Sequence, residues 1–176
     1  MPSLSPRVWA GIVALVVFLL DRGSKLWIQA NVGPLDTIPI IPDVFNIVYA
    51  RNRGAAFGMM SSAPEWARVS VLIGLSTAIL GFICWMLWQA TREGQLASRS
   101  QRWALSLVLG GAIGNLHDRI LEGSVTDFIQ VFFGSYEYPS FNVADSAIFV
   151  GAVLMGYELI FQKENKKEGS GVSETH

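Results

Sequence analysis

Two aspartates lie at the facing ends of the last two apolar stretches of the chain. Asp127 closes the third stretch within Val125–Phe128, and Asp145 opens the fourth after Phe141–Ala144. A carboxylate beside hydrocarbon is costly, so its presence at a membrane boundary indicates a function. When two carboxylates lie close together, one keeps a proton and the other stays charged. The charged one can activate water while the protonated one polarises a carbonyl, which is the chemistry of an aspartic peptidase.

Asp145 also has a structural interpretation, because a carboxylate at the start of a helix stabilises the positive end of the helix dipole. Asn142 precedes it by three residues, and a second carboxylate lies across a short hairpin. These neighbours favour the catalytic interpretation over simple capping. Gly123 is expected to end or bend the preceding helix, which frees Asp127 to point inward.

A dense polar face occupies the end of the third apolar stretch. Gly110 and Gly114 have the small-residue spacing that lets two helices approach closely. Asn115, Asp118 and Arg119 share one helical face, which must turn toward protein or water and not toward lipid. We expect Asp118 to form a structural network with Arg119 that fixes helix packing. Arg119 has the alternative of holding a substrate carbonyl.

Two further sets of polar residues precede this face. Asn52 and Gly54 lie in a glycine- and alanine-rich segment, Arg51–Gly58, that permits close backbone approach to an extended peptide. An ordinary turn after a strand explains this segment equally well. Asp21 and Lys25 are four residues apart and are expected to pair on one helix face in a structural role.

Other catalytic chemistries lack parts in this sequence. His117 and His176 are the only histidines, without the ligand cluster that a zinc site needs, so we expect neither a metal nor another cofactor. Ser24 and Lys25 are adjacent, and adjacent positions on a helix do not face each other. The net charge is −1, with no basic stripe to neutralise phosphates, which argues against nucleic acid as a partner.

The elements that position these residues are predicted to be four membrane-spanning helices. The chain is 51% hydrophobic and only 15% charged, and a spanning helix needs about 20 mostly apolar residues. The predicted spans cover residues 8–28, 69–88, 103–121 and 145–161. No small-x-small cleavage site follows the first stretch, and more apolar residues come after it, so we interpret it as a retained helix and not a cleaved signal peptide.

Basic residues near the predicted helix ends indicate the orientation. One side collects Arg7, Arg92, Arg99, Arg102, Lys163, Lys166 and Lys167, although the first loop is also basic. Both termini are therefore predicted to be cytoplasmic, with Asp127 and Asp145 on the outer face.

The loop at residues 33–60 is too polar and proline-rich to span a membrane. Thr37–Pro42 and Phe45–Ala50 have the β-branched and aromatic composition of strands, and prolines restrict the first to a sheet edge. Gly134–Pro139 is interpreted as a turn-like interfacial stretch. The predicted fold class is thus a mainly α membrane protein with a small extracytoplasmic β element in the first outer loop. Residues 1–162 form one domain, and residues 163–176 a disordered polar tail.

Five short motifs, taken together, resemble lipoprotein signal peptidase, the signal peptidase II family of bacterial inner-membrane aspartyl proteases. The motifs are Asp21-x-x-x-Lys25, Asn52-x-Gly54-Ala55-Ala56-Phe57, Gly114-Asn115-x-x-Asp118-Arg119, Val125-x-Asp127-Phe128 and Phe141-Asn142-x-Ala144-Asp145. They occur in the family's order over about 125 residues, which makes the resemblance specific although each motif alone is weak. His117 occupies a position that is variable in the family.

The resemblance implies a membrane endopeptidase that removes the signal peptide of a prolipoprotein before its diacylglyceryl-modified cysteine. It makes Asp127 and Asp145 the catalytic pair, and it implies inhibition by globomycin-type peptides. The substrate groove would be lined by Asn52, Gly54, Asn115, Arg119 and Asn142. The implied location is the bacterial inner membrane, in contact with its lipid, with a periplasmic β element and an active site at the periplasmic face.

Two other classes of membrane protein compete with a peptidase. A proton-coupled carrier tends to place its acids near the bilayer midplane, often in repeated halves, whereas here the acids gather at one boundary and no repeat is visible. A structural membrane protein would use the acids only for helix packing. Either rival would keep its function after Asp127→Asn or Asp145→Asn.

Overall fold

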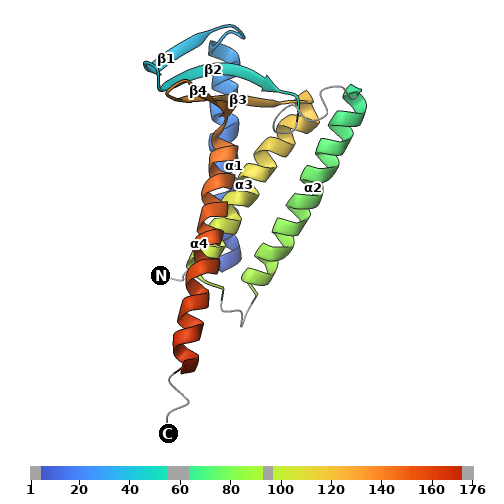
Figure 1. Ribbon diagram of the computed structural model, residues 1–176. Helices are drawn as coiled ribbons and strands as arrows, with labels where there is room; N and C mark the ends of the chain where they lie inside the picture. The colour runs from blue at the N-terminus through green and yellow to red at the C-terminus, as the bar shows by residue number, and fades with distance from the viewer. Residues whose placement is uncertain (1–4, 55–63, 93–96, 172–176) are drawn as a thin grey trace.

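Four long helices and one small sheet make up the structure, a computed structural model that describes residues 5–54, 64–92 and 97–171, with side chains as far as residue 160. The elements are α1 Pro6–Asn31, β1 Thr37–Ile41, β2 Phe45–Asn52, α2 Glu65–Ala90, α3 Arg99–Glu122, β3 Val125–Phe133, β4 Tyr136–Phe141 and α4 Val143–Gly171. The helices run alongside one another, and the sheet lies across one end of them (Figure 1). The start of α1 and the end of α4 lie at the other end.

The surface of α1 is arranged with its charges inside. Asp21 and Lys25 are 0% exposed, whereas Leu19 and Leu20 are 57% and 60% exposed. Leucines turned outward and charges turned inward reverse the pattern of a helix in water and fit lipid surroundings. Among the described helices, α2 and residues Val143–Ile160 of α4 are long and apolar enough to cross a membrane, with mean hydropathies of 2.1 and 1.6.

Glycines let α3 pack closely against the helices beside it. A Cβ atom on Gly110 would lie 2.6 Å from the backbone oxygen of Ala14 in α1, and one on Gly111 would collide with the backbone oxygen of Ala144 in α4. A Cβ atom on Gly114 would lie 2.5 Å from the Asp21 carboxylate. The close approach predicted from the spacing of Gly110 and Gly114 is therefore confirmed.

The sheet is antiparallel with the strand order β1-β2-β3-β4. The two strands predicted in the first loop are confirmed as β1 and β2, and β1, which contains Pro39, lies at the edge of the sheet as predicted. On β2, Ala50 pairs with Asp127 of β3, so the first loop reaches directly to one of the two aspartates.

The prediction that the β element belongs to the first loop alone was wrong. β3 and β4 come from residues 125–141, for which the sequence pattern predicts the end of an apolar stretch followed by a turn. The segment Val125–Phe133 is rich in β-branched and aromatic residues, which suits a strand. Gly134, with φ of 63°, lies between β3 and β4 at a position that favours glycine.

Two helix boundaries position the aspartates. Gly123 caps α3 in the left-handed conformation, with φ of 65°, which confirms that the helix ends before Asp127. α4 begins at Val143 and continues to Gly171, beyond the predicted end at Phe161. The helix thus runs into the polar tail, residues 163–176, whose disorder stays a prediction; residues 172–176 lie outside the described residues.

Candidate active site

Asp127 lies on β3, one of the inner strands of the sheet, and is 2% exposed. Its Oδ2 atom accepts a hydrogen bond of 3.0 Å from Nδ2 of Asn52, and its Oδ1 atom accepts one of 2.7 Å from Nδ2 of Asn142. These donors come from β2 and from the start of α4, so two segments distant in sequence hold one carboxylate.

Asp145 lies in the first turn of α4 and is half-buried. Its Oδ1 atom accepts a hydrogen bond of 2.7 Å from Nδ2 of Asn115, and its backbone N–H donates to Oδ1 of Asn142 at 2.9 Å. Asn142 therefore makes the capping hydrogen bond of α4, while Asp145 lies in the first turn, where its carboxylate also suits the positive end of the helix dipole. Because Asn142 also donates to Asn115 and to Asp127, the two asparagines join the two aspartates.

Burial, followed by the nearby charge of Asp145, raises the pKa of Asp127 to about 6. The hydrogen bonds from Asn52 and Asn142 and the charge of Lys25 lower this pKa and offset part of the rise. The two carboxylates therefore lie within electrostatic range of each other. Asp127 therefore keeps its proton to a higher pH than an ordinary aspartate does.

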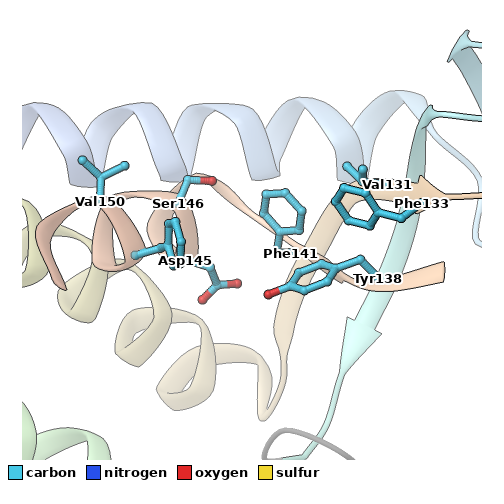
Figure 2. A pocket seen from close by; sticks show the side chains of 8 residues that line it. Val131, Phe133, Tyr138, Phe141, Asp145, Ser146 and Val150 are labelled. Atoms are coloured by element: carbon cyan, nitrogen blue, oxygen red, sulfur yellow. The ribbon is translucent and has the colours of Figure 1, made fainter. Parts of the chain in front are cut away.

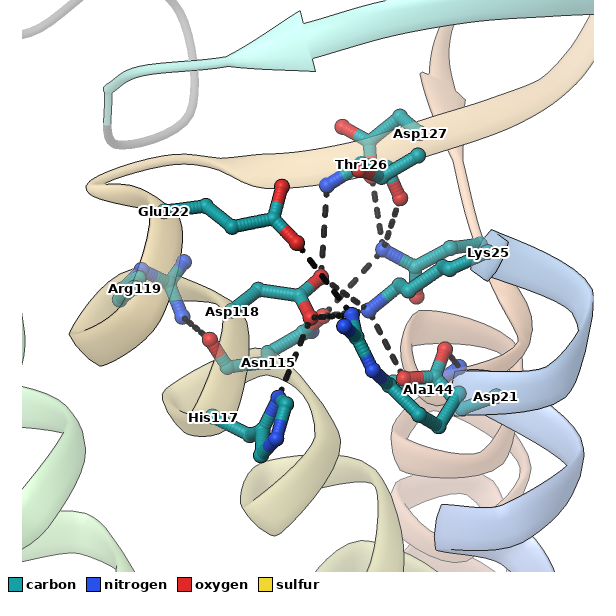
Figure 3. Close-up of polar contacts among 12 residues, drawn as sticks. Asp21, Lys25, Asn115, His117, Asp118, Arg119, Glu122, Thr126, Asp127 and Ala144 are labelled. Atoms are coloured by element: carbon teal, nitrogen blue, oxygen red, sulfur yellow. Dashed lines mark hydrogen bonds and ion pairs between the residues drawn. The ribbon is translucent and has the colours of Figure 1, made fainter. Parts of the chain in front are cut away.

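A buried cluster of charges lies below Asp127, between α1 and α3 (Figure 3). Nζ of Lys25 lies 2.8 Å from Oδ2 of Asp21 and 2.8 Å from Oδ2 of Asp118. All three side chains are inaccessible to solvent, and Arg22 approaches Asp118 at 3.3 Å from the partly exposed side. The predicted Asp21–Lys25 pair is thus confirmed, and it is part of a larger network.

The predicted pairing of Asp118 with Arg119 was wrong. Asp118 points toward α1 and pairs with Lys25 and Arg22, because neighbouring positions on a helix face different directions. Arg119 makes a long hydrogen bond of 3.4 Å to the backbone oxygen of Asn115 (Figure 3). Its guanidinium lies within electrostatic range of Asp145 and Asp127, at the border of the site.

The charge cluster also fixes the start of α4. Oδ1 of Asp21 accepts a hydrogen bond of 2.9 Å from the backbone N–H of Ala144, next to Asp145. Nζ of Lys25 donates to Oδ1 of Asn115 at 3.1 Å, and Asn115 in turn donates to Asp145. The buried ion pairs therefore position the aspartates through Ala144 and Asn115.

The motif in the first loop contributes Asn52 and Gly54. Oδ1 of Asn52 accepts a hydrogen bond from the Gly54 N–H at 3.2 Å while its Nδ2 donates to Asp127. The turn and the contact with the site are both present, so the two interpretations of this segment are compatible. Ala55, Ala56 and Phe57, the rest of the motif, lie outside the described residues.

Sequence reasoning missed a second polar layer between α1, α3 and β3. Nε2 of Gln29 donates to Oγ1 of Thr126 at 2.9 Å and to Glu122 at 3.1 Å. Arg22 also pairs with Glu122 at 3.3 Å. A signal was available, because Gln29 lies one turn after Lys25 and Glu122 one turn after Asp118.

An apolar helical bundle that holds one buried and one half-buried carboxylate, joined by asparagines, under a small sheet has the architecture of a membrane peptidase. The chain belongs to the signal peptidase II family, since the family model described as signal peptidase (SPase) II matches residues 13–161.

Similar proteins and structures agree with this family. The chain is 42% identical to a lipoprotein signal peptidase of Solibacter usitatus over 174 residues, which is 98% of this chain and 100% of the relative. It is 40% identical to one of Shewanella sp. MR-4 over 163 residues, covering 91% and 90% of the two chains. A solved bacterial membrane enzyme superposes with a TM-score of 0.77 at 30% identity, covering 90% of this chain and 92% of that one.

Proposed function

We propose that the protein removes the signal peptide of a prolipoprotein by cleaving the peptide bond before its lipid-modified cysteine, with water activated by Asp127 and Asp145. The observation that carries this proposal is the joining of the two aspartates by Asn115 and Asn142. Family membership and the names of the relatives support the substrate class.

The surroundings of the two carboxylates assign them different tasks. Burial and the nearby charge of Asp145 both favour the neutral form of Asp127, so Asp127 holds the proton and Asp145 is the base. Asp145 takes a proton from the water molecule while the water oxygen attacks the carbonyl carbon. At the same time Asp127 gives its proton to the carbonyl oxygen. Asp127 regains that proton when the intermediate collapses, the C–N bond breaks, and the proton on Asp145 passes to the leaving amine.

The remaining polar residues hold the pair and the peptide. Asn52, Asn115 and Asn142 fix the carboxylates by hydrogen bonds, and the Gly54 N–H in turn holds the Asn52 side chain. Arg119, with donors directed in a planar fork, is suited to a peptide carbonyl. A globomycin-type peptide would compete for the same groove.

We further propose four membrane spans, formed by α1 to α4, with both termini in the cytoplasm. The sheet and the aspartates then lie at the periplasmic face of the bacterial inner membrane, surrounded by its lipid. The support is that the sheet lies at one end of the bundle, while α1 starts and α4 ends at the other (Figure 1). Arg99 and Arg102, in the first turn of α3, lie at that second end, as the positive-inside rule requires.

The test is cleavage of a lipid-modified precursor by the purified protein in membranes. Asp127→Asn and Asp145→Asn should each abolish cleavage while the protein still inserts. Asp43→Asn is the matched control, because Asp43 is an exposed aspartate in the turn between β1 and β2. Normal processing by either active-site variant would contradict the assignment of Asp127 and Asp145 as the catalytic pair, and would favour a structural role for the two acids.

A further inference from the structure

A pocket of about 480 Å³ opens beside Asp145, between the β3–β4 hairpin and the first turns of α4. Figure 2 shows Asp145 and Ser146 at its α4 side, and Phe133, Tyr138 and Phe141 across from them on the hairpin. The catalytic mechanism proposed above uses Asp145 and leaves the rest of this pocket without a task.

The walls of the pocket are apolar and support one another. Tyr138 packs edge to face on Phe141, with 5.9 Å between ring centroids, and on Phe133 at 6.4 Å. Phe149 and Val150 complete the wall from α4. Interlocked rings of this kind form a hydrophobic surface before any ligand arrives.

The polar end of the pocket excludes an anionic ligand. The Ser146 hydroxyl donates to the backbone oxygen of Asn142 at 2.9 Å, so its proton is already used. Asp145 brings negative charge, and no lysine or arginine is among the described residues that line the pocket. A phosphate would be repelled, so the ligand that fits is uncharged, with a hydrocarbon body and a polar attachment near Asp145.

We propose that this pocket binds one acyl chain of the lipid carried by the cysteine next to the scissile bond. The inference rests on the proposed function, because only a lipid-bearing substrate ties hydrocarbon to the cleavage site. When the bond lies at Asp145, a chain attached to the neighbouring residue reaches the pocket directly. Phe149 and Val150 are 68% and 48% exposed on α4, a helix apolar enough to cross a membrane, so the chain enters sideways from lipid.

Such a pocket acts through placement and not through hydrophobic transfer. A chain that leaves the bilayer exchanges one apolar medium for another and gains little on that account. Packing against rigid rings instead orients the cysteine at the two aspartates, which affects the rate at which the bound substrate is cleaved. We therefore expect changes in the pocket to alter kcat/KM in a manner that depends on acyl chain length.

The first test compares two synthetic precursors in mixed micelles, one with palmitoyl and one with butanoyl chains on the cysteine. Val150→Trp fills the pocket and should lower kcat/KM for the palmitoyl precursor about tenfold, as about 1.4 kcal/mol of overpacking would. Cleavage of the butanoyl precursor should stay near wild type. Val153→Trp is the matched control, since Val153 is a 54% exposed residue of α4 outside the pocket lining.

Equal effects of Val150→Trp on both precursors, or equal effects of the two tryptophan variants, would overturn the assignment. A loss that follows the length of the signal peptide and not of the acyl chain would also overturn it, and would place the signal helix in the pocket. If the wild type cleaves neither precursor, the proposed function itself fails.

A second measurement needs no cleavage and does not depend on the folding of the Val150→Trp variant. A precursor with a diazirine at the end of one acyl chain is photolysed on the Asp127→Asn protein. Crosslinks at Phe149, Val150 or Tyr138 support the pocket, and crosslinks spread over the leucines of α1 mean that the chain stays in bulk lipid.

Discussion

The stability of the Asp127→Asn variant, measured relative to wild type, should increase as the pH rises. Burial holds the pKa of Asp127 at about 6 in the folded protein, against 3.8 in an ordinary aspartate. Between these values the folded protein keeps a proton that the unfolded chain has released. Wild-type stability therefore falls as the pH rises through this window, and the loss is complete above it.

The size of the effect follows from the two pKa values. A rise from 3.8 to about 6 corresponds to about 3 kcal/mol at 1.36 kcal/mol per pH unit. The asparagine side chain of the variant carries no charge, so the variant escapes this loss, although its amide group replaces an acceptor with a donor facing Asn52 or Asn142. The cost of that mismatch is the same at every pH, so it does not affect how the stability of the variant changes with pH.

The measurement is the melting temperature of both proteins in detergent at several pH values from about 4 to 7. About 3 kcal/mol corresponds to a relative change of about 6–12 °C in a chain of this size. Asp43→Asn, at an exposed turn, serves as the control for the removal of a carboxylate as such. Asp145→Asn should reduce the pH dependence of the wild type, because it removes the charge that helps to hold the proton on Asp127.

A constant difference in melting temperature between Asp127→Asn and wild type over this pH range would refute the reasoning. It would mean that Asp127 is not held protonated by burial, and that the assignment of Asp145 as the base has no physical support. A difference that shrinks as the pH rises would mean that the hydrogen bonds to the charged form outweigh burial.

Three further predictions concern the residues that hold the site. Asn142→Ala removes the cap of α4 and a donor to Asp127, so we expect about 2–4 kcal/mol of destabilisation in unfolding experiments and a large loss of cleavage. Lys25→Met removes the ammonium group shared by two buried carboxylates, although Arg22 stays near Asp118 and the Ala144 N–H stays bonded to Asp21, and it should cost about 3–5 kcal/mol, visible as loss of folded protein in detergent. Gly111→Leu should separate α3 from α4, reducing both melting temperature and activity, whereas Gly156→Leu, in open space on α4, should reduce neither.

Local spacing predicted the contacts within one helix and the close approach of two helices. Asp21 and Lys25 pair because four residues make one turn, and Gly110 and Gly114 fit against α1 for the same reason. Gly123 ends α3 because only a residue without a side chain adopts φ of 65° freely. These features depend on a few neighbouring positions, so the sequence shows them directly.

Contacts between distant segments were harder to predict. Asp118 pairs with Lys25 and with Arg22, the latter 96 positions away, and spacing on one helix gives no hint of such a partner. β3 was missed because an apolar run after a helix has the same composition whether it continues as helix or pairs as a strand. Its pairing with β2 decides the matter, and that pairing is a tertiary contact.

The placement of the ion pairs explains how a carboxylate with a raised pKa is held in one position. Each aspartate of the pair receives hydrogen bonds from asparagines, which stay neutral, and the charge cluster reaches the pair through the hydrogen bond from Lys25 to Asn115. Lys25 pairs with Asp21 and Asp118 and not with Asp127, so its charge lowers the pKa of Asp127 less than burial raises it. Were Lys25 paired with Asp127 directly, the pKa of Asp127 would fall and the pair would lose the proton that its chemistry needs.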